Sequence, residues 1–194
     1  SLQQLRSQVA LIPQDPFLFS LTIRNNLTYD EPDRELPPIE HAAQLAELLD
    51  AIEEFPDGME TMVGERGITL SGGQKQRATL ARGLIRDARI LAMDDCFSSV
   101  DTRTEERILG RLKEVRQGRT TLLISHRVST ARHADRIFVM EGGQILESGT
   151  HAELIAKGGY YADLEAVQSN QDQDRQRKAA LLRNLDIDVR VVNG

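Results

Sequence analysis

The sequence is poor in residues that characterise several classes of protein. Its 194 residues include one cysteine, Cys96, no tryptophan, and only 4% aromatic residues. A single cysteine excludes an internal disulfide and agrees with a reducing compartment. No apolar run approaches the roughly 18 residues of a membrane-spanning helix, so the longest runs predict buried strands.

The sequence also lacks a basic excess. Lysine and arginine number 24 against 30 acidic residues, which gives a net charge of −6. Nucleic-acid-binding proteins normally carry the opposite balance, so we expect no nucleic-acid partner. A nucleotide ligand remains compatible with this charge, because backbone amides can bind phosphate without basic side chains.

Apolar patterning predicts an α/β fold. Short apolar runs typical of strands occur at 8–12, 89–93, 120–125 and 136–140. Helical spacing of apolar residues occurs at 21–29, 38–54, 72–86, 102–116 and about 150–166. This alternation predicts βαβ units and a mostly parallel sheet. Gly142 and Gly143 predict a hairpin after the last strand.

The sequence LSGGQ at residues 70–74 is the most specific motif. Ser71 and Gln74 have the spacing of a capping box, which predicts the start of a helix at this point. Gly72 and Gly73 let the backbone approach a ligand closely and leave several amides unpaired, which favours a bound phosphate. The alternative is a glycine-containing turn before an ordinary helix.

Polar residues follow three of the predicted strands. Asp94 and Asp95 end one strand, where an aspartate can hold Mg²⁺ and a second acid can activate water. His126 follows another strand and Gln14 a third. Ends of parallel strands meet at one edge of a sheet, so we expect these residues to gather there. The alternatives are a helix-capping aspartate and a structural histidine.

Together these residues resemble the ATP-binding domain of ABC transporters over about residues 1–165. The matching segments are Gln14 (Q-loop), 70–74 (signature), 90–95 (Walker B), 98–101 (D-loop) and His126 (switch histidine). The sequence VGERG at 63–67 resembles the coupling segment of exporters.

The resemblance implies a P-loop NTPase-like fold with a mostly parallel sheet and an α-helical subdomain. It places a partial nucleotide-binding domain at 1–166, its helical subdomain at about 20–86, and a polar tail at 167–194. Gln14 would act as the hinge of that subdomain, which would contact a membrane-spanning domain. The expected location is the cytoplasmic face of the cell membrane, and the expected ligands are ATP and Mg²⁺.

In this family two ATP-binding domains meet head to tail, and the resemblance assigns the residues to two ATP molecules. The partner's ATP would contact Ser71, Gly72, Gly73 and Gln74. The resemblance also assigns Asp101 to nucleotide binding. The chain's own ATP would be served by the catalytic residues Asp95, His126 and Gln14. Asp94 and Gln14 would ligate Mg²⁺.

The sequence departs from the family in two ways. No G-x-x-x-x-G-K-[ST] phosphate loop occurs in it. We therefore expect a chain that begins after that loop, missing the N-terminal part of the fold, and that is inactive alone. Asp95 also stands where the family usually has glutamate. Its side chain is shorter by about 1.5 Å, and a catalytic group misplaced by about 1 Å can cost much of the reaction rate. That shortening favours the weaker site of a heterodimeric exporter, although a homodimer remains open.

Two further functions remain open. The chain could be a non-catalytic module that lends its signature to a partner's ATP site. It could also be an ABC ATPase that acts on nucleic acid, which the exporter-like 63–67 segment, the absence of long coiled-coil heptads and the net charge all disfavour.

Overall fold

The computed structural model describes residues 2–64 and 68–170. They form two compact units, one up to His133 and one from Ala134 onward. In the part of the chain that is described, no helix is both long and apolar enough to cross a membrane.

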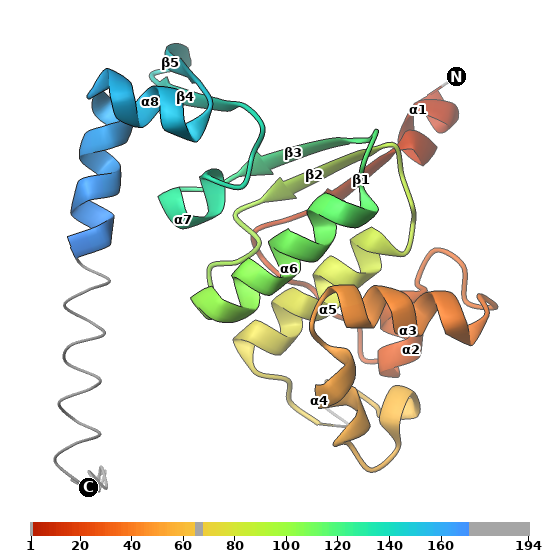
Figure 1. Cartoon of the computed structure of the whole chain (residues 1–194). Coiled ribbons are helices and arrows are strands. Elements are labelled where there is room, and N and C mark those ends of the chain that lie inside the picture. Colours follow the sequence, from red (N-terminus) through yellow and green to blue (C-terminus); the bar gives the residue numbers. More distant parts are fainter. Residues whose placement is uncertain (1, 65–67, 171–194) are drawn as a thin grey trace, which may run out of the picture. The chain divides into compact units, whose positions relative to one another are not determined.

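The first unit is built on a parallel sheet. Strands β1 (Val9–Ile12), β2 (Ile90–Asp94) and β3 (Thr120–Ile124) lie in the order β1-β2-β3 (Figure 1). Both pairs are parallel and in simple register, with Ile12 beside Met93 and Met93 beside Leu123. The predicted parallel sheet is confirmed, and its three strands end at a common edge.

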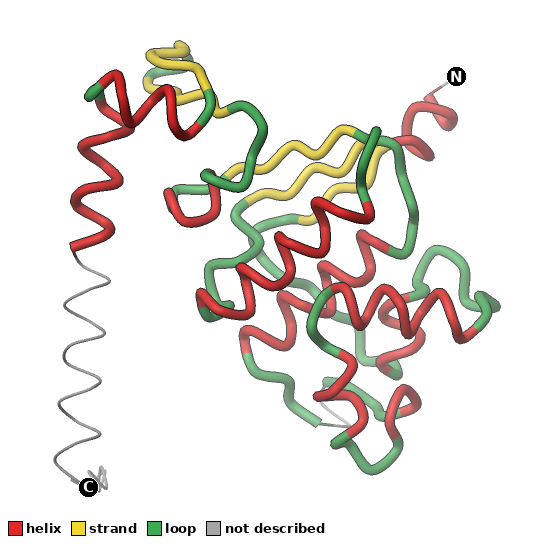
Figure 2. Tube along the Cα trace, in the orientation of Figure 1, coloured by secondary structure: helices red, strands yellow, loops and turns green. Residues whose placement is uncertain are grey.

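Helices α5 (Gly72–Leu84) and α6 (Thr102–Val115) lie along the same face of this sheet (Figures 1 and 2). A Cβ on Gly83 would lie 2.5 Å from Ile12 Cγ1, so glycine lets α5 pack tightly on β1. Leu91 and Met93 are fully buried on this side. Alternate strand residues on the other face, Leu11 and Leu122, are 64% and 56% exposed among the described residues.

The remaining helices of this unit are short. They are α1 (Leu2–Gln8), α2 (Ile23–Leu27), α3 (Leu36–Leu45), α4 (Leu49–Glu53), a 3-10 turn (Gly58–Glu60) and α7 (Val128–Ala131). The predicted helix at 38–54 is therefore two helices. Glu47 separates them, because its φ of 54° is left-handed and cannot continue a helix.

The second unit is a hairpin followed by helices. Strand β4 (Ile137–Glu141) pairs antiparallel with β5 (Gln144–Gly149), and Gly142 and Gly143 have φ of 56° and 79° in the turn. The hairpin prediction is confirmed. The assignment of 136–140 to the parallel sheet is wrong, because β4 pairs with β5 instead.

The predicted helix at about 150–166 is interrupted. Helix α8 (His151–Lys157) ends at Gly158, whose φ of 64° is left-handed, and residues 160–170 form a further helix. The polar tail predicted from 167 begins inside that helix, and its remainder, 171–194, lies outside the described residues.

Candidate functional site

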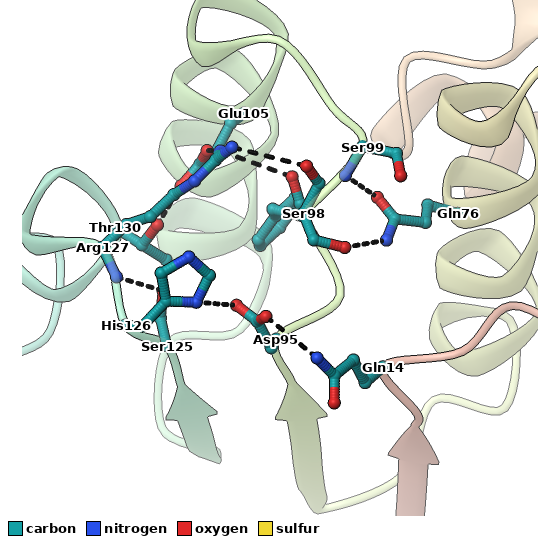
Figure 3. A network of polar contacts seen from close by, with 11 residues as sticks. Gln14, Gln76, Asp95, Ser98, Ser99, Glu105, Ser125, His126, Arg127 and Thr130 are labelled. Carbon is teal, nitrogen blue, oxygen red and sulfur yellow. Dashed lines mark hydrogen bonds and ion pairs between the residues drawn. The ribbon is translucent and has the colours of Figure 1, made fainter. Parts of the chain in front are cut away.

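Gln14, Asp95 and His126 meet at the end of the parallel strands. Gln14 Nε2 donates a hydrogen bond to Asp95 Oδ2 over 3.3 Å, and His126 Nδ1 lies 3.1 Å from Asp95 Oδ1. Figure 3 shows Asp95 between the other two side chains, each of which follows a different strand. These residues are 81 and 31 positions from Asp95 in the chain, and the parallel sheet brings them together.

The backbone fixes Asp95 in an uncommon conformation. Its φ is 42°, and its amide donates to the Ile124 carbonyl over 2.9 Å. Left-handed backbone is costly for most residues, although aspartate tolerates it better, and it occurs often at functional sites. The Asp95 side chain is 14% exposed, whereas that of His126 is 68% exposed. Asp95 is therefore held in place, and the imidazole is accessible to a ligand.

Asp94 is the last residue of β2, beside Ile124 of β3. No group of three His, Cys, Asp or Glu side chains with metal-binding geometry occurs in the described parts of the chain. Mg²⁺ does not require one, because it commonly binds one or two protein oxygens and takes its other ligands from phosphate and water. The Asp94 carboxylate and the Gln14 amide oxygen are oxygen donors of the kind that this coordination uses.

The thiol of neighbouring Cys96 is not available as a thiolate ligand or nucleophile. Burial raises the pKa of its thiol to about 12, so the sulfur stays protonated at neutral pH.

The 70–74 motif forms the predicted helix start. Ser71 N donates to Gln74 Oε1 over 2.8 Å, and Gln74 N donates to Ser71 Oγ over 3.2 Å. This capping box satisfies two amides. Those of Gly72 and Gly73 have no acceptor among the described residues, and Ser71 and Gly72 are exposed. The helix end therefore offers two amides, supported by its dipole, to an anion.

The second glycine of the motif also has a packing role. A Cβ on Gly73 would lie 2.8 Å from the Ser99 carbonyl oxygen. The 98–101 segment therefore lies directly against the start of α5, a contact that the sequence does not reveal.

Two other predicted segments remain. Asp101 of the first has a structural role, and the second lies only partly within the described residues. Asp101 is the N-cap of α6, and its carboxylate accepts a hydrogen bond from Thr104 N over 3.1 Å. Hydrogen bonds from Thr104 hold the pKa of Asp101 below its ordinary value. In the 63–67 segment, Val63 is buried, while 65–67 lie outside the described residues.

Sequence reasoning missed three polar residues beside the site, two of which are buried. Gln76 and Glu105 are 3% and 1% exposed, and Arg127 follows His126 directly. Their signal was present in the sequence, because Gln76 and Glu105 occupy positions in line with the apolar faces of α5 and α6. On α6 that face continues with Ile108, Leu109 and Leu112.

Known proteins resemble this chain in sequence and in fold. The chain is 48% identical over 168 residues to an uncharacterized ABC transporter ATP-binding protein, YknU, of Bacillus subtilis, covering 87% of this chain. It is 45% identical over 173 residues to an ATP-dependent lipid A-core flippase of Burkholderia pseudomallei, covering 89% of this chain. The chain spans 29% of the length of each of these relatives.

A solved structure of a bacterial Atm1-family ABC exporter with ATP bound matches with a TM-score of 0.79 and 40% identity. The match covers 86% of this chain and 29% of that one. It agrees with the predicted ABC-type α/β fold. Residues 1–98 match the sequence model of the ABC transporter family. The parallel sheet, the capped SGG helix start and these likenesses together establish that the chain belongs to the ABC transporter family.

Proposed function

We propose that the chain is part of the ATP-hydrolysing subunit of an exporter, in which Asp95, Gln14 and His126 act on one ATP molecule. The observation that carries the proposal is the contact of both Asp95 oxygens, one with Gln14 and one with His126. Asp95 would orient the attacking water, and the exposed imidazole of His126 would contact the terminal phosphate. Asp94 and Gln14 would supply protein ligands to Mg²⁺, which neutralises phosphate charge when bound.

A second ATP molecule, which another ABC domain would hold, would contact the start of α5. The support is the exposed helix end with its two available amides at Gly72 and Gly73. The two domains would thus each complete the other's site, and Ser71 and Gln74 would act across their interface.

The chain would require a phosphate loop from outside these 194 residues to hold ATP. The apolar sheet face with exposed Leu11, Leu122 and Ile124 supports this, because parallel sheets are normally covered on both faces. We propose that a segment carrying the loop covers this face, and that the chain alone binds ATP weakly. The assembled protein would join a membrane-spanning domain at the cytoplasmic face of the cell membrane.

A non-catalytic role is favoured by one observation. Asp95 is shorter than the glutamate usual in the family, so its carboxylate lies closer to the backbone than that of a glutamate would. The chain would then lend Ser71, Gly72, Gly73 and Gln74 to a partner's ATP without hydrolysing its own.

Substitution of the exposed histidine separates the two functions. In the full-length transporter, His126→Ala should lower the maximal rate of Mg²⁺-ATP hydrolysis by about a hundredfold if this site is catalytic. His41→Ala, which alters an exposed histidine of α3, is the matched control and should leave the rate unchanged. Full activity of the His126→Ala protein would refute catalysis at this site and leave the lending role.

A further inference from the structure

A cavity of about 330 Å³ lies between α3 and the C-terminal ends of α5 and α6. Short connections lead from these two helix ends to the starts of β2 and β3, whereas Asp95 and His126 follow the ends of the same strands (Figure 1). The cavity is therefore at the opposite edge of the sheet from the proposed ATP site. Its volume is in the range of pockets that bind small molecules.

One part of the cavity wall is apolar. Leu45 belongs to α3, Leu84 ends α5, and Val115 ends α6. Val115 is 43% exposed, and Leu45 and Leu84 are half-buried. An aliphatic or aromatic group bound here would remove apolar surface of all three side chains from water, which favours binding.

The rest of the wall carries an excess of positive charge. Three guanidinium groups, those of Arg34, Arg116 and Arg119, line the cavity. Asp87 supplies the one carboxylate among the described residues that line it, and Arg119 Nη2 donates to Asp87 Oδ2 over 3.1 Å. Outside the wall, Glu31 Oε2 lies 2.5 Å from Arg34 Nη2. Two of the three guanidinium groups therefore have a carboxylate partner.

The third guanidinium group, that of Arg116, contacts only neutral acceptors within the described residues. It is 8% exposed and donates to the backbone carbonyls of Ala88, Arg89 and Thr120 and to the Thr121 hydroxyl. Burial lowers the pKa of Arg116, and the charge of Arg119 lowers it further, whereas Asp87 raises it. Since an arginine nevertheless stays protonated, a bound anion would stabilise this buried charge.

Two donors at the cavity are also available to a ligand. The four bonds of Arg116 leave one N–H of its Nη1 for another acceptor. Arg34 Nε is buried and has no hydrogen-bond partner in the part of the chain that is described. Buried donors normally have an acceptor, so the oxygens of an anion would satisfy groups that the chain leaves unpaired.

From these observations we infer that the cavity binds a small amphipathic carboxylate. Its carboxylate group lies among the three guanidinium groups, and its apolar body packs on Leu45, Leu84 and Val115. Inorganic phosphate would leave the apolar wall uncovered, and an uncharged apolar molecule would leave Arg116 without a counter-ion. The inference goes beyond the proposed ATP chemistry and does not depend on it.

Octanoate is the probe, because it combines a carboxylate with an apolar body. Octanamide has nearly the same shape without the charge. Nuclear magnetic resonance of methyl groups in the 194-residue chain follows a titration with each compound. Octanoate should shift the methyl signals of Leu45, Leu84 and Val115 with a Kd of about 1 mM or tighter. Octanamide should bind at least about tenfold more weakly, because charge-assisted hydrogen bonds are the stronger ones.

Two substitutions test the position of the ligand. Arg34→Gln removes one guanidinium group and should weaken octanoate binding by about tenfold. Arg103→Gln, on the exposed first turn of α6, is its matched control. Val115→Glu places a carboxylate at the rim of the cavity and should abolish octanoate binding by repulsion of like charges. Val167→Glu, at a residue that is 54% exposed in the helix at 160–170, is the second control.

Both test residues tolerate substitution better than buried Arg116, because the side chain of Arg34 is 22% exposed and Val115 is 43% exposed. Either variant decides the question if the other does not fold. Shifts confined to Leu11, Leu122 and Ile124 would place octanoate on the exposed sheet face and overturn the inference. Equal affinities for octanoate and octanamide would also overturn it. So would unchanged octanoate binding in the folded variants, or no methyl shift at millimolar octanoate.

Discussion

At the scale of single residues, the proposed chemistry depends most on Asp95. Its left-handed backbone and its contacts with Gln14 and His126 fix the carboxylate at the strand ends. Both carboxylate oxygens therefore already contact side chains of the protein. A longer side chain on the same backbone would place its carboxylate farther from the backbone.

We therefore expect Asp95→Glu to raise ATP hydrolysis at this site in the full-length transporter by roughly tenfold or more, since about 1 Å of misplacement can cost a hundredfold. Steady-state kinetics measure the change. Asp95→Asn, similar in size but uncharged, is the control and should abolish turnover at this site. No gain in the glutamate variant would count against a site weakened by its short acid.

At the scale of elements, glycines of two helices allow a matched comparison. Gly73→Ala places a Cβ 2.8 Å from the Ser99 carbonyl, whereas Gly110 of α6 has open space around it. Gly73→Ala should destabilise the chain by about 1–3 kcal/mol through overpacking. Gly110→Ala should stabilise it by about 0.5–1 kcal/mol through helix propensity. Urea unfolding measures both, and equal effects would mean that the 98–101 segment does not press on α5.

In the second unit, Glu147 of β5 caps the helix at 160–170. Its carboxylate accepts from Tyr161 N over 3.1 Å and from Tyr160 N over 3.2 Å. The Tyr161 amide contributes most to holding the pKa of Glu147 below its ordinary value of 4.5. Because the folded-state pKa is the lower one, this stabilisation is complete above pH 4.5 and is lost as the pH falls through the folded-state value.

Hydrogen exchange of the 160–170 amides should therefore accelerate below about pH 4.5, beyond the intrinsic effect of pH on exchange. Glu147→Gln should lower protection at neutral pH and remove this additional acid dependence. An acid dependence retained in Glu147→Gln would assign it to another group.

Much of the element order was predictable from local signals. The capping box located α5, and Gly142 and Gly143 located the hairpin. The break at Glu47 was not predictable, because a non-glycine residue adopts left-handed backbone there. The absence of β4 from the parallel sheet was not predicted either, because an apolar run does not show which sheet it joins.

The positions of the candidate site residues were also predictable from the sequence. Strand ends placed Gln14, Asp95 and His126 at one edge, where the structure brings them together. The roles assigned to them remain predictions. Gln76 and Arg127 were missed because their importance depends on tertiary contacts with Ser98, although the position of Gln76 in line with buried Leu80 on α5 was a visible signal.

At the scale of the whole molecule, the residues proposed to act on a phosphate belong to this chain, whereas the loop proposed to hold the phosphate would come from another segment. The chain presents an exposed SGG helix start and a polar edge, and it contains no G-x-x-x-x-G-K-[ST] sequence. Among the described residues, the sheet face that carries Leu11 and Leu122 is largely exposed, which supports the proposal that another segment covers it. ATP affinity should therefore belong to the assembly.

Calorimetric titration of Mg²⁺-ATP tests this claim most directly, first into the chain alone and then into the chain mixed with an ABC domain that carries an intact phosphate loop. We predict a Kd weaker than about 1 mM for the chain alone, corresponding to less than about 4 kcal/mol of binding free energy. In the mixture, ATP should bind more tightly than to the added domain alone, and Gly73→Ala in this chain should remove the gain. A micromolar Kd for the chain by itself would contradict the account.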